Sequence, residues 1–240
     1  KTTIPVLLEI DVDGHRSGIR PDGAELLPAA AALADGAELV GVLTHAGDSY
    51  ECKTTAEIEA AAEAERAGIV LAAERLRAAG HTVKIVSAGS TPTLMFAKDE
   101  TGVTEMRAGV CALFDLFMSN VGACTVDDIA GSVLATVIGR QVDKRRVILD
   151  CGFLALSRDR GTARQAHDYG YGLVCGLDGK PLADGTIVLT GTNQEHGILT
   201  LPENSPLTQE DFPIGRRLRI LPNHACPTAA PYGSLVLIEN

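Results

Sequence analysis

The sequence predicts an α/β half, in which strands and helices alternate, followed by a β-rich half built from short antiparallel strands. The first 118 residues alternate aliphatic strand-like runs with alanine-rich helical stretches, the pattern of a parallel α/β architecture. From residue 119 onward the β-branched runs are short and are separated by Gly, Pro and Asp, as antiparallel strands are. We therefore predict two domains, residues 1–118 and 119–240.

In the first half, each predicted strand is followed by a polar loop. Residues 5–12 are expected to form a buried strand that carries the carboxylates of Glu9 and Asp11. A long helix with Glu and Arg on its outer face is expected to end at Gly80. The expected elements are strands over residues 5–12, 38–44, 83–87 and 105–109 and helices over 24–34 and 54–79. Active sites of parallel barrels lie at the strand ends, so we expect functional residues in these loops.

The second half is expected to be a β-rich domain with an aliphatic core. Tryptophan is absent and aromatic residues make up 4% of the chain, so Val, Ile and Leu have to fill the interior. The predicted strands cover residues 132–138, 146–150, 171–175, 186–190, 196–201, 216–221 and 234–238.

Charge and cysteine usage narrow the functional classes. The net charge of −10, from 31 acidic and 21 basic residues, argues against nucleic acid or an anionic membrane as a general partner. No apolar run approaches the roughly 20 residues of a transmembrane helix. The six cysteines form no C-x-x-C pair, which predicts reduced thiols and a cytoplasmic protein. The chain opens at Lys1 with a run typical of a central strand, so we expect no signal peptide and a fragment or processed chain.

The segment from Pro222 to Thr228 carries the strongest single chemical signal. His224 and Cys226 are two positions apart, and in an extended segment such residues project from the same face. A nitrogen and a thiolate suit zinc, and two protein ligands would leave open positions for water or substrate, as catalytic metals need. The competing interpretation is a buried free cysteine beside a structural histidine. His196 is a candidate third ligand or acid–base group.

Weaker candidates follow the strands of the first half. The loop Gly89-Ser90-Thr91 offers backbone N–H groups and two hydroxyls that suit a phosphate, although such a loop is most often only a turn. Arg16 is either functional or a surface arginine in a salt bridge with a neighbouring aspartate. Tyr50 and His45 are equally compatible with structural roles.

The order of these pieces resembles the D-serine dehydratase-like and D-threonine aldolase-like enzymes, which are pyridoxal-phosphate (PLP) proteins of the alanine racemase fold, fold type III. The motifs that carry the resemblance are Leu8-Glu9-Ile10-Asp11-Val12 with Arg16 and Gly18, Gly47-Asp48-Ser49-Tyr50, Ser87-Ala88-Gly89-Ser90-Thr91-Pro92-Thr93, Glu105-Met106-Arg107-Ala108-Gly109, Glu195-His196-Gly197 and Pro222-Asn223-His224-Ala225-Cys226. The resemblance implies the C-terminal half of a PLP-binding (β/α)8 barrel followed by a β-rich C-terminal domain.

The resemblance also implies roles for individual residues. Arg16 matches the arginine that faces the pyridine nitrogen, and Tyr50 matches a tyrosine that contacts the cofactor. Ser90, Thr91, Gly109 and Val110 match the phosphate cradle. His224 and Cys226 match ligands of a divalent metal, zinc in our reading with manganese as the other metal to test. The chain departs from the family at Leu43 and at Val110-Cys111, on the cofactor side, and at Asp48, where the family more often has histidine.

No lysine of this chain matches the Schiff-base lysine of the family, which lies on the first barrel strand. The lysines considered are Lys1, Lys53, Lys84, Lys98, Lys144 and Lys180. By resemblance, residues 5–12 form about the fifth barrel strand, and half a barrel would expose two unpaired strand edges. We therefore expect the lysine and the missing N-terminal half-barrel outside this chain, as a separate piece or one that was lost. The family also suggests a homodimer.

The expected function is that of a PLP- and metal-dependent lyase that converts a D-serine-type β-hydroxy D-amino acid into a keto acid and ammonia. The related aldolases carry His-x-Asp at the metal, so His-x-Cys favours dehydration. The alternatives are a D-threonine-type aldolase, a 3-hydroxyaspartate dehydratase and a non-catalytic PLP-binding protein of the same fold. A metal-dependent hydrolase, with Glu9 and Asp11 as ligands, is a further alternative from another class.

Overall fold

The computed structural model describes residues 3–33 and 36–238, and the chain divides into two compact units, Lys1–Gly109 and Val110–Asn240. Lys1 and the predicted helix end at Ala34 lie outside the described residues. Among the described helices, none is both long and apolar enough to cross a membrane. The α/β architecture followed by a β-rich antiparallel part is confirmed.

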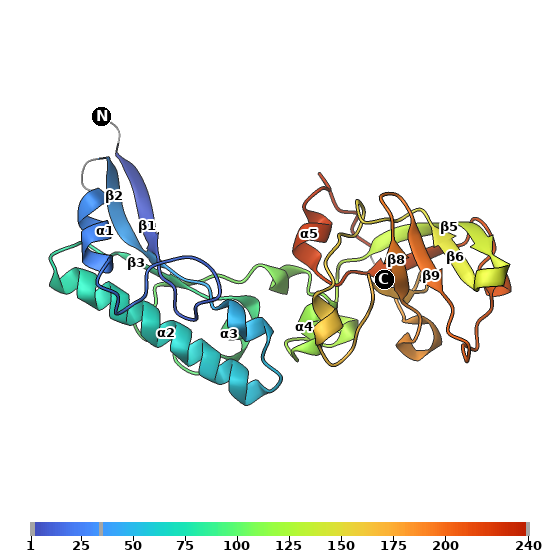
Figure 1. The fold of residues 1–240 in the computed structure, drawn as a ribbon, viewed down its shortest axis with the longest axis horizontal. Coiled ribbons are helices and arrows are strands. Elements are labelled where there is room, and N and C mark those ends of the chain that lie inside the picture. The colour runs from blue at the N-terminus through green and yellow to red at the C-terminus, as the bar shows by residue number, and fades with distance from the viewer. Residues whose placement is uncertain (1–2, 34–35, 239–240) are drawn as a thin grey trace. The chain divides into compact units, whose positions relative to one another are not determined.

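The first unit is built on a parallel sheet whose strands are paired in chain order (Figure 1). Its strands are β1 (Ile4–Glu9), β2 (Ala37–Leu43), β3 (Ile85–Ala88) and β4 (Glu105–Met106). The helices that connect them are α1 (Leu26–Ala32), α2 (Thr55–Ala78) and α3 (Thr91–Phe96). Parallel neighbours need such crossovers, and they bring the carboxyl ends of all four strands to one edge of the sheet.

Helix α2 forms where the sequence supplies both of its end signals. The Thr54 side chain accepts a hydrogen bond from the Glu57 backbone N–H at 3.2 Å, and the Glu57 carboxylate accepts one from the Thr54 N–H at 3.1 Å. Beyond the other end, Gly80 has φ +90°, a left-handed conformation that glycine adopts without a Cβ clash. The buried face of α2 packs against the sheet through Ile69, Ala72, Ala73 and Leu76.

The second unit contains a six-stranded antiparallel sheet in the order β7-β10-β5-β6-β9-β8. Its strands are β5 (Val133–Gln141), β6 (Arg146–Leu149), β7 (Leu173–Cys175), β8 (Leu189–Thr192), β9 (Gly197–Thr200) and β10 (Arg217–Leu221). Short helices α4 (Leu116–Asn120) and α5 (Ala225–Ala229) lie outside the sheet. The core is aliphatic, as composition predicted, apart from the fully buried ring of Phe212.

One predicted strand is wrong. Residues 234–238 adopt no strand, and the side chains of Leu235, Val236 and Leu237 are exposed. A β-branched run forms a strand only when a neighbouring strand satisfies its backbone groups, and none of the described strands pairs with these residues.

Candidate functional site

Loops after β1, β2 and β3 carry the predicted cofactor residues of the first unit. Arg16 follows β1, Tyr50 ends the short 3-10 helix after β2, and Ser90 follows β3. The structure relates two of them through His45. The Tyr50 ring centroid lies 5.9 Å from that of His45, and the charge of Arg16 contributes to the pKa of the same imidazole. Arg16 is not paired with Asp11, whose carboxylate lies 3.8 Å from Arg20 instead.

The Gly89-Ser90-Thr91 loop has the chemistry of an anion cradle. Gly89 has φ +114°, and a Cβ there would lie 2.9 Å from the backbone of Arg107, so the close approach requires glycine. Ser90 is already engaged, because its hydroxyl accepts a hydrogen bond from the Thr93 N–H and lies 3.1 Å from the Ser49 hydroxyl. The Thr91 hydroxyl is buried with no hydrogen-bond partner among the described residues. A buried orphan hydroxyl in this loop fits a phosphate group.

His45 lies at the same edge, after β2. Burial lowers its pKa, with the positive charge of Arg16 as the next cause. Its Nδ1 lies 3.3 Å from the Gly89 carbonyl oxygen, and its Nε2 is buried with no partner within the part of the chain that the structure describes. The sequence left this histidine undecided between a structural and a functional role. The structure places it among the predicted cofactor residues.

Sequence reasoning missed Glu65, the buried carboxylate that ties two of these loops together. Its Oε1 accepts hydrogen bonds from the Ala46 N–H at 2.9 Å and from the Gly89 N–H at 3.1 Å. The expectation that the glutamates of α2 face outward is therefore wrong at this position, where the residue is 1% exposed. A signal was available, because Glu65 falls on the stripe of Ile58, Ala62 and Ile69 at helical spacing.

The departure at Asp48 has a local explanation. Its carboxylate lies 3.0 Å from His15 Nδ1, and its backbone N–H donates to Asp13. The His15 ring lies directly against Gly47, where any Cβ would collide with it at 2.3 Å. This part of the motif therefore fixes the loop after β1 onto the loop after β2.

Gly109 and Val110 lie on either side of the boundary between the two units. A Cβ at Gly109 would meet no atom within 4 Å, so packing does not require glycine there. The Val110 side chain is buried in its own unit. The phosphate-binding role expected for these two residues stays a prediction.

In the second unit, the predicted metal ligands lie where β10 passes into α5. His224 is extended and immediately precedes the helix, whereas Cys226 is in its first turn. The expected extended geometry is therefore wrong for Cys226, because the helix begins at Ala225. Cys226 is exposed at the surface of its unit, although partial burial of its sulfur raises the thiol pKa. The interpretation as a buried cysteine does not hold.

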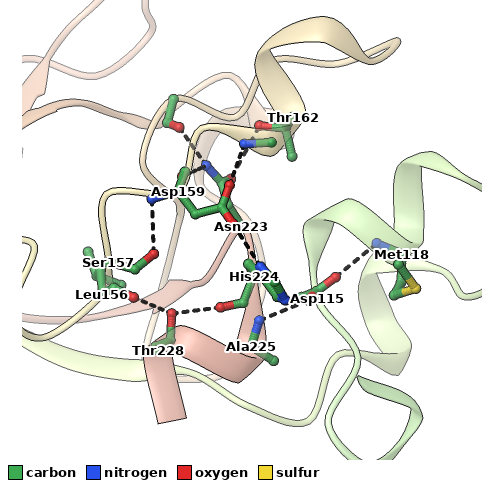
Figure 2. A network of polar contacts seen from close by, with 12 residues as sticks. Asp115, Met118, Leu156, Ser157, Asp159, Thr162, Asn223, His224, Ala225 and Thr228 are labelled. Carbon is green, nitrogen blue, oxygen red and sulfur yellow. Dashed lines mark hydrogen bonds and ion pairs between the residues drawn. The ribbon is translucent and has the colours of Figure 1, made fainter. Parts of the chain in front are cut away.

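A carboxylate that the sequence did not single out holds the imidazole of His224. Asp159 Oδ2 lies 2.7 Å from His224 Nδ1. Figure 2 marks the polar contacts between these residues with dashed lines. This hydrogen bond is the main reason that the pKa of His224 is raised and that of Asp159 lowered. Asp159 belongs to none of the sequence motifs described above, and it lies in an irregular loop far from His224 in the chain.

Hydrogen bonds from neighbouring residues hold the backbone around His224 in place (Figure 2). Asp115 is fully buried and accepts hydrogen bonds from the backbone N–H groups of Ala225 at 2.8 Å and Met118 at 2.9 Å. Burial raises the pKa of this carboxyl group despite these two donors. The Thr228 hydroxyl donates to the carbonyl oxygen of Leu156 and lies 2.9 Å from that of His224. The segment is thus preorganised by the protein alone.

The other candidate metal ligands are not gathered here. Among the described residues, no group of three His, Cys, Asp or Glu side chains is arranged to hold a metal ion. His196 therefore belongs to no such group of described residues. Glu9 accepts a hydrogen bond from the Ser17 hydroxyl and Asp11 from the Gly14 N–H, so the two carboxylates of the hydrolase alternative serve local turns. The assignment of His224 and Cys226 as metal ligands stays a prediction.

In comparisons with known proteins, two family models match this chain, one in each half. The family model described as alanine racemase, N-terminal domain, matches residues 1–116, and that of a putative serine dehydratase domain matches residues 130–238. The D-threo-3-hydroxyaspartate dehydratase of Delftia sp. HT23 is 55% identical over 95% of this chain and 60% of its own length. The D-serine dehydratase of Dictyostelium discoideum is 29% identical over 98% of this chain and 61% of its own length.

Solved structures give the same result. The Delftia dehydratase structure matches with a TM-score of 0.88, covering 95% of this chain and 61% of that one. One structure of that enzyme is a cysteine-to-alanine mutant in a metal-free form. D-threonine aldolase from Filomicrobium marinum, at 22% identity and a TM-score of 0.73 over 96% of this chain and 58% of its own, shares the fold. The chain spans about 60% of the length of the curated dehydratases it matches.

Proposed function

The chain belongs to the D-serine dehydratase-like and D-threonine aldolase-like family of the alanine racemase fold, and on that premise we propose that it forms part of a PLP- and metal-dependent dehydratase. Its proposed substrates are β-hydroxy D-amino acids, and its products are a keto acid and ammonia. The observation that carries the proposal is the His224–Cys226 pair, whose imidazole is already oriented by a carboxylate. This donor set suits zinc, with manganese as the alternative.

PLP and the metal would supply different parts of the chemistry. When bound, PLP supplies an electron sink for the substrate α-carbon, and the metal supplies a Lewis acid for the β-hydroxyl group. On the metal side, His224 Nε2 and the Cys226 thiolate would hold the ion and leave positions for the substrate hydroxyl.

On the cofactor side, the buried Thr91 hydroxyl and the backbone around Ser90 would hold the phosphate, together with Gly109 and Val110. Arg16 would face the pyridine nitrogen and Tyr50 would contact the ring. The lysine that carries the cofactor is expected outside the residues of this chain. Removal of the α-proton is therefore assigned to no residue here.

The substrate proposal distinguishes two dehydratases. D-serine was the substrate expected from the sequence, with 3-hydroxyaspartate as an alternative. The 55% identity to the Delftia D-threo-3-hydroxyaspartate dehydratase, against 29% to a D-serine dehydratase, favours 3-hydroxyaspartate. We also propose that the protein acts as a homodimer.

Product analysis on the full-length protein, loaded with PLP and zinc, tests the reaction. D-threo-3-hydroxyaspartate should yield oxaloacetate and ammonia faster than D-serine yields pyruvate and ammonia. Formation of glycine and an aldehyde would identify an aldolase instead, and activity without PLP would favour the hydrolase. Cys226→Ala should abolish turnover, with Cys52→Ala in the first unit as the control. A Cys226→Ala enzyme with full activity would contradict the metal role.

A further inference from the structure

The loop from Ser157 to Thr162, here called the orienting loop, carries Asp159. It leads from the region after β6 toward β7 and contains no regular strand or α-helix, only the start of a short 3-10 turn. Loops of this kind are expected at the surface, with their polar groups in water. Instead, this loop directs its hydrogen bonds inward to the segment that carries His224 (Figure 2).

Every polar group of Asp159 is used within this arrangement. Its backbone N–H donates to the Ser157 hydroxyl at 3.2 Å, and its carbonyl oxygen accepts from the Asn223 side-chain amide at 3.1 Å. One carboxylate oxygen accepts from the Gly161 N–H at 2.7 Å, and the other lies 2.7 Å from His224 Nδ1. The carboxylate is therefore held at one distance and one angle from the imidazole.

Asn223, the residue next to His224, is also held once more by this loop and once by Gly170, which lies outside it. The Asn223 amide also donates to the Gly170 carbonyl oxygen at 2.6 Å, and its oxygen lies 3.4 Å from the Thr162 hydroxyl, which is a donor there. Both Asn223 and Thr162 are buried. The imidazole and its carboxylate are therefore positioned from a common framework and do not depend on each other alone.

Ser157 shows that the loop conformation is costly. Its φ of +137° lies in a region that residues with a side chain rarely adopt. Strain of this kind persists where the surrounding structure enforces it, frequently at functional sites. The strained residue is two positions from Asp159 and supplies the hydroxyl that accepts its N–H.

We propose that Asp159 is a positioning residue for the metal ligand His224, and that the orienting loop exists to hold it. By accepting the Nδ1 proton, Asp159 fixes the imidazole in the tautomer whose Nε2 lone pair can bind a metal. It also fixes the ring plane and raises the basicity of Nε2. Outer partners of this kind change metal affinity by about 10–100-fold. The inference rests on the proposed metal site.

Metal affinity of the full-length protein is the primary test. Zinc dissociation constants are measured by competition with a chromophoric chelator for the wild type, Asp159→Asn and Asp168→Asn. Asp168 is a matched control, because it lies in the same region and accepts hydrogen bonds from Arg160 and from the Gly170 N–H. We expect Asp159→Asn to weaken zinc binding by about 10–100-fold and Asp168→Asn to leave it unchanged. Thermal unfolding without metal checks that both variants fold.

Asp159→Asn with wild-type zinc affinity would overturn the positioning role. If His224→Ala and Cys226→Ala also kept wild-type affinity, the metal site itself would be misassigned, so the two failures are distinguishable. A measurement on the wild type covers the case in which Asp159→Asn does not fold. Nitrogen-15 NMR of the zinc-loaded protein should show His224 protonated at Nδ1 and metal-bound at Nε2. Protonation at Nε2 would contradict the proposal.

Discussion

Glu65 in the first unit and Asp159 in the second are both carboxylates that hold other groups by hydrogen bonds, but the groups that they hold differ in kind. Glu65 belongs to a regular helix and holds two backbone N–H groups, those of Ala46 and Gly89. Asp159 belongs to an irregular, strained loop and holds a side chain, that of His224. The first arrangement holds two loops together, whereas the second orients one imidazole, that of the predicted metal ligand His224. A phosphate is held by several backbone donors, but a metal needs a lone pair in a defined direction.

The comparison predicts its largest effect at Glu65. Glu65→Ala removes the acceptor of two N–H groups, and each buried group left unpaired costs about 1–3 kcal/mol. We expect a lower unfolding temperature together with weaker PLP binding in a spectroscopic titration of the full-length protein. Glu65→Gln keeps an acceptor oxygen and should retain most of the affinity.

Glu74 provides the control for this experiment, because it is exposed on the same helix. Glu74→Ala should change neither stability nor cofactor binding. If Glu65→Ala behaved like Glu74→Ala, the buried carboxylate would not be holding the loops.

A smaller effect is expected for Thr54→Ala, which tests whether the stability of α2 can be lowered without disturbing the loops that Glu65 holds. Thr54→Ala removes the N-terminal cap of the helix and should cost about 1 kcal/mol of unfolding free energy. Because Glu65 still reaches both loops in the folded state, PLP affinity should stay at the wild-type value. A parallel loss of affinity in Thr54→Ala would mean that any weakening of α2 disturbs the cradle, and the comparison with Asp159 would lose its basis.

The smallest expected effect is the pH dependence that His45 contributes. Its pKa is lowered by burial and then by Arg16, so below its ordinary value of 6.5 the unfolded chain takes up the proton first. Stability is therefore lost as the pH falls from 6.5 through the lowered folded-state value, and is fully present above 6.5. In urea unfolding, His45→Gln should lose less stability than the wild type over this acidic range. An identical pH profile would show that His45 is not buried as a neutral group.

The sequence was sufficient for the architecture because long, regular elements carry their own signals. The alanine-rich run that ends at Gly80 predicted α2, and the β-branched runs between residues 132 and 221 predicted the strands of the second unit, with ends shifted by a few residues. The predicted strand at 234–238 failed because strand formation depends on a free neighbour, which a local pattern does not reveal.

For the site, sequence motifs identified groups that can act but not the groups that hold them. His224, Cys226 and Thr91 belong to recognisable motifs, whereas Asp159 is distant in sequence from the histidine it contacts. Glu65 could have been found, because helical periodicity places it on the buried stripe of α2. Asp159 could not, because an irregular loop has no period from which the direction of a side chain can be read.

X-ray absorption at the zinc edge of the zinc-loaded full-length protein tests the central claim most directly, namely that His224 and Cys226 hold a metal. The account predicts one protein sulfur at about 2.3 Å and an imidazole nitrogen at about 2.0–2.1 Å from the zinc. In Cys226→Ala the sulfur contribution should disappear. A wild-type spectrum without sulfur, or a sulfur signal that survives in Cys226→Ala, would contradict the account.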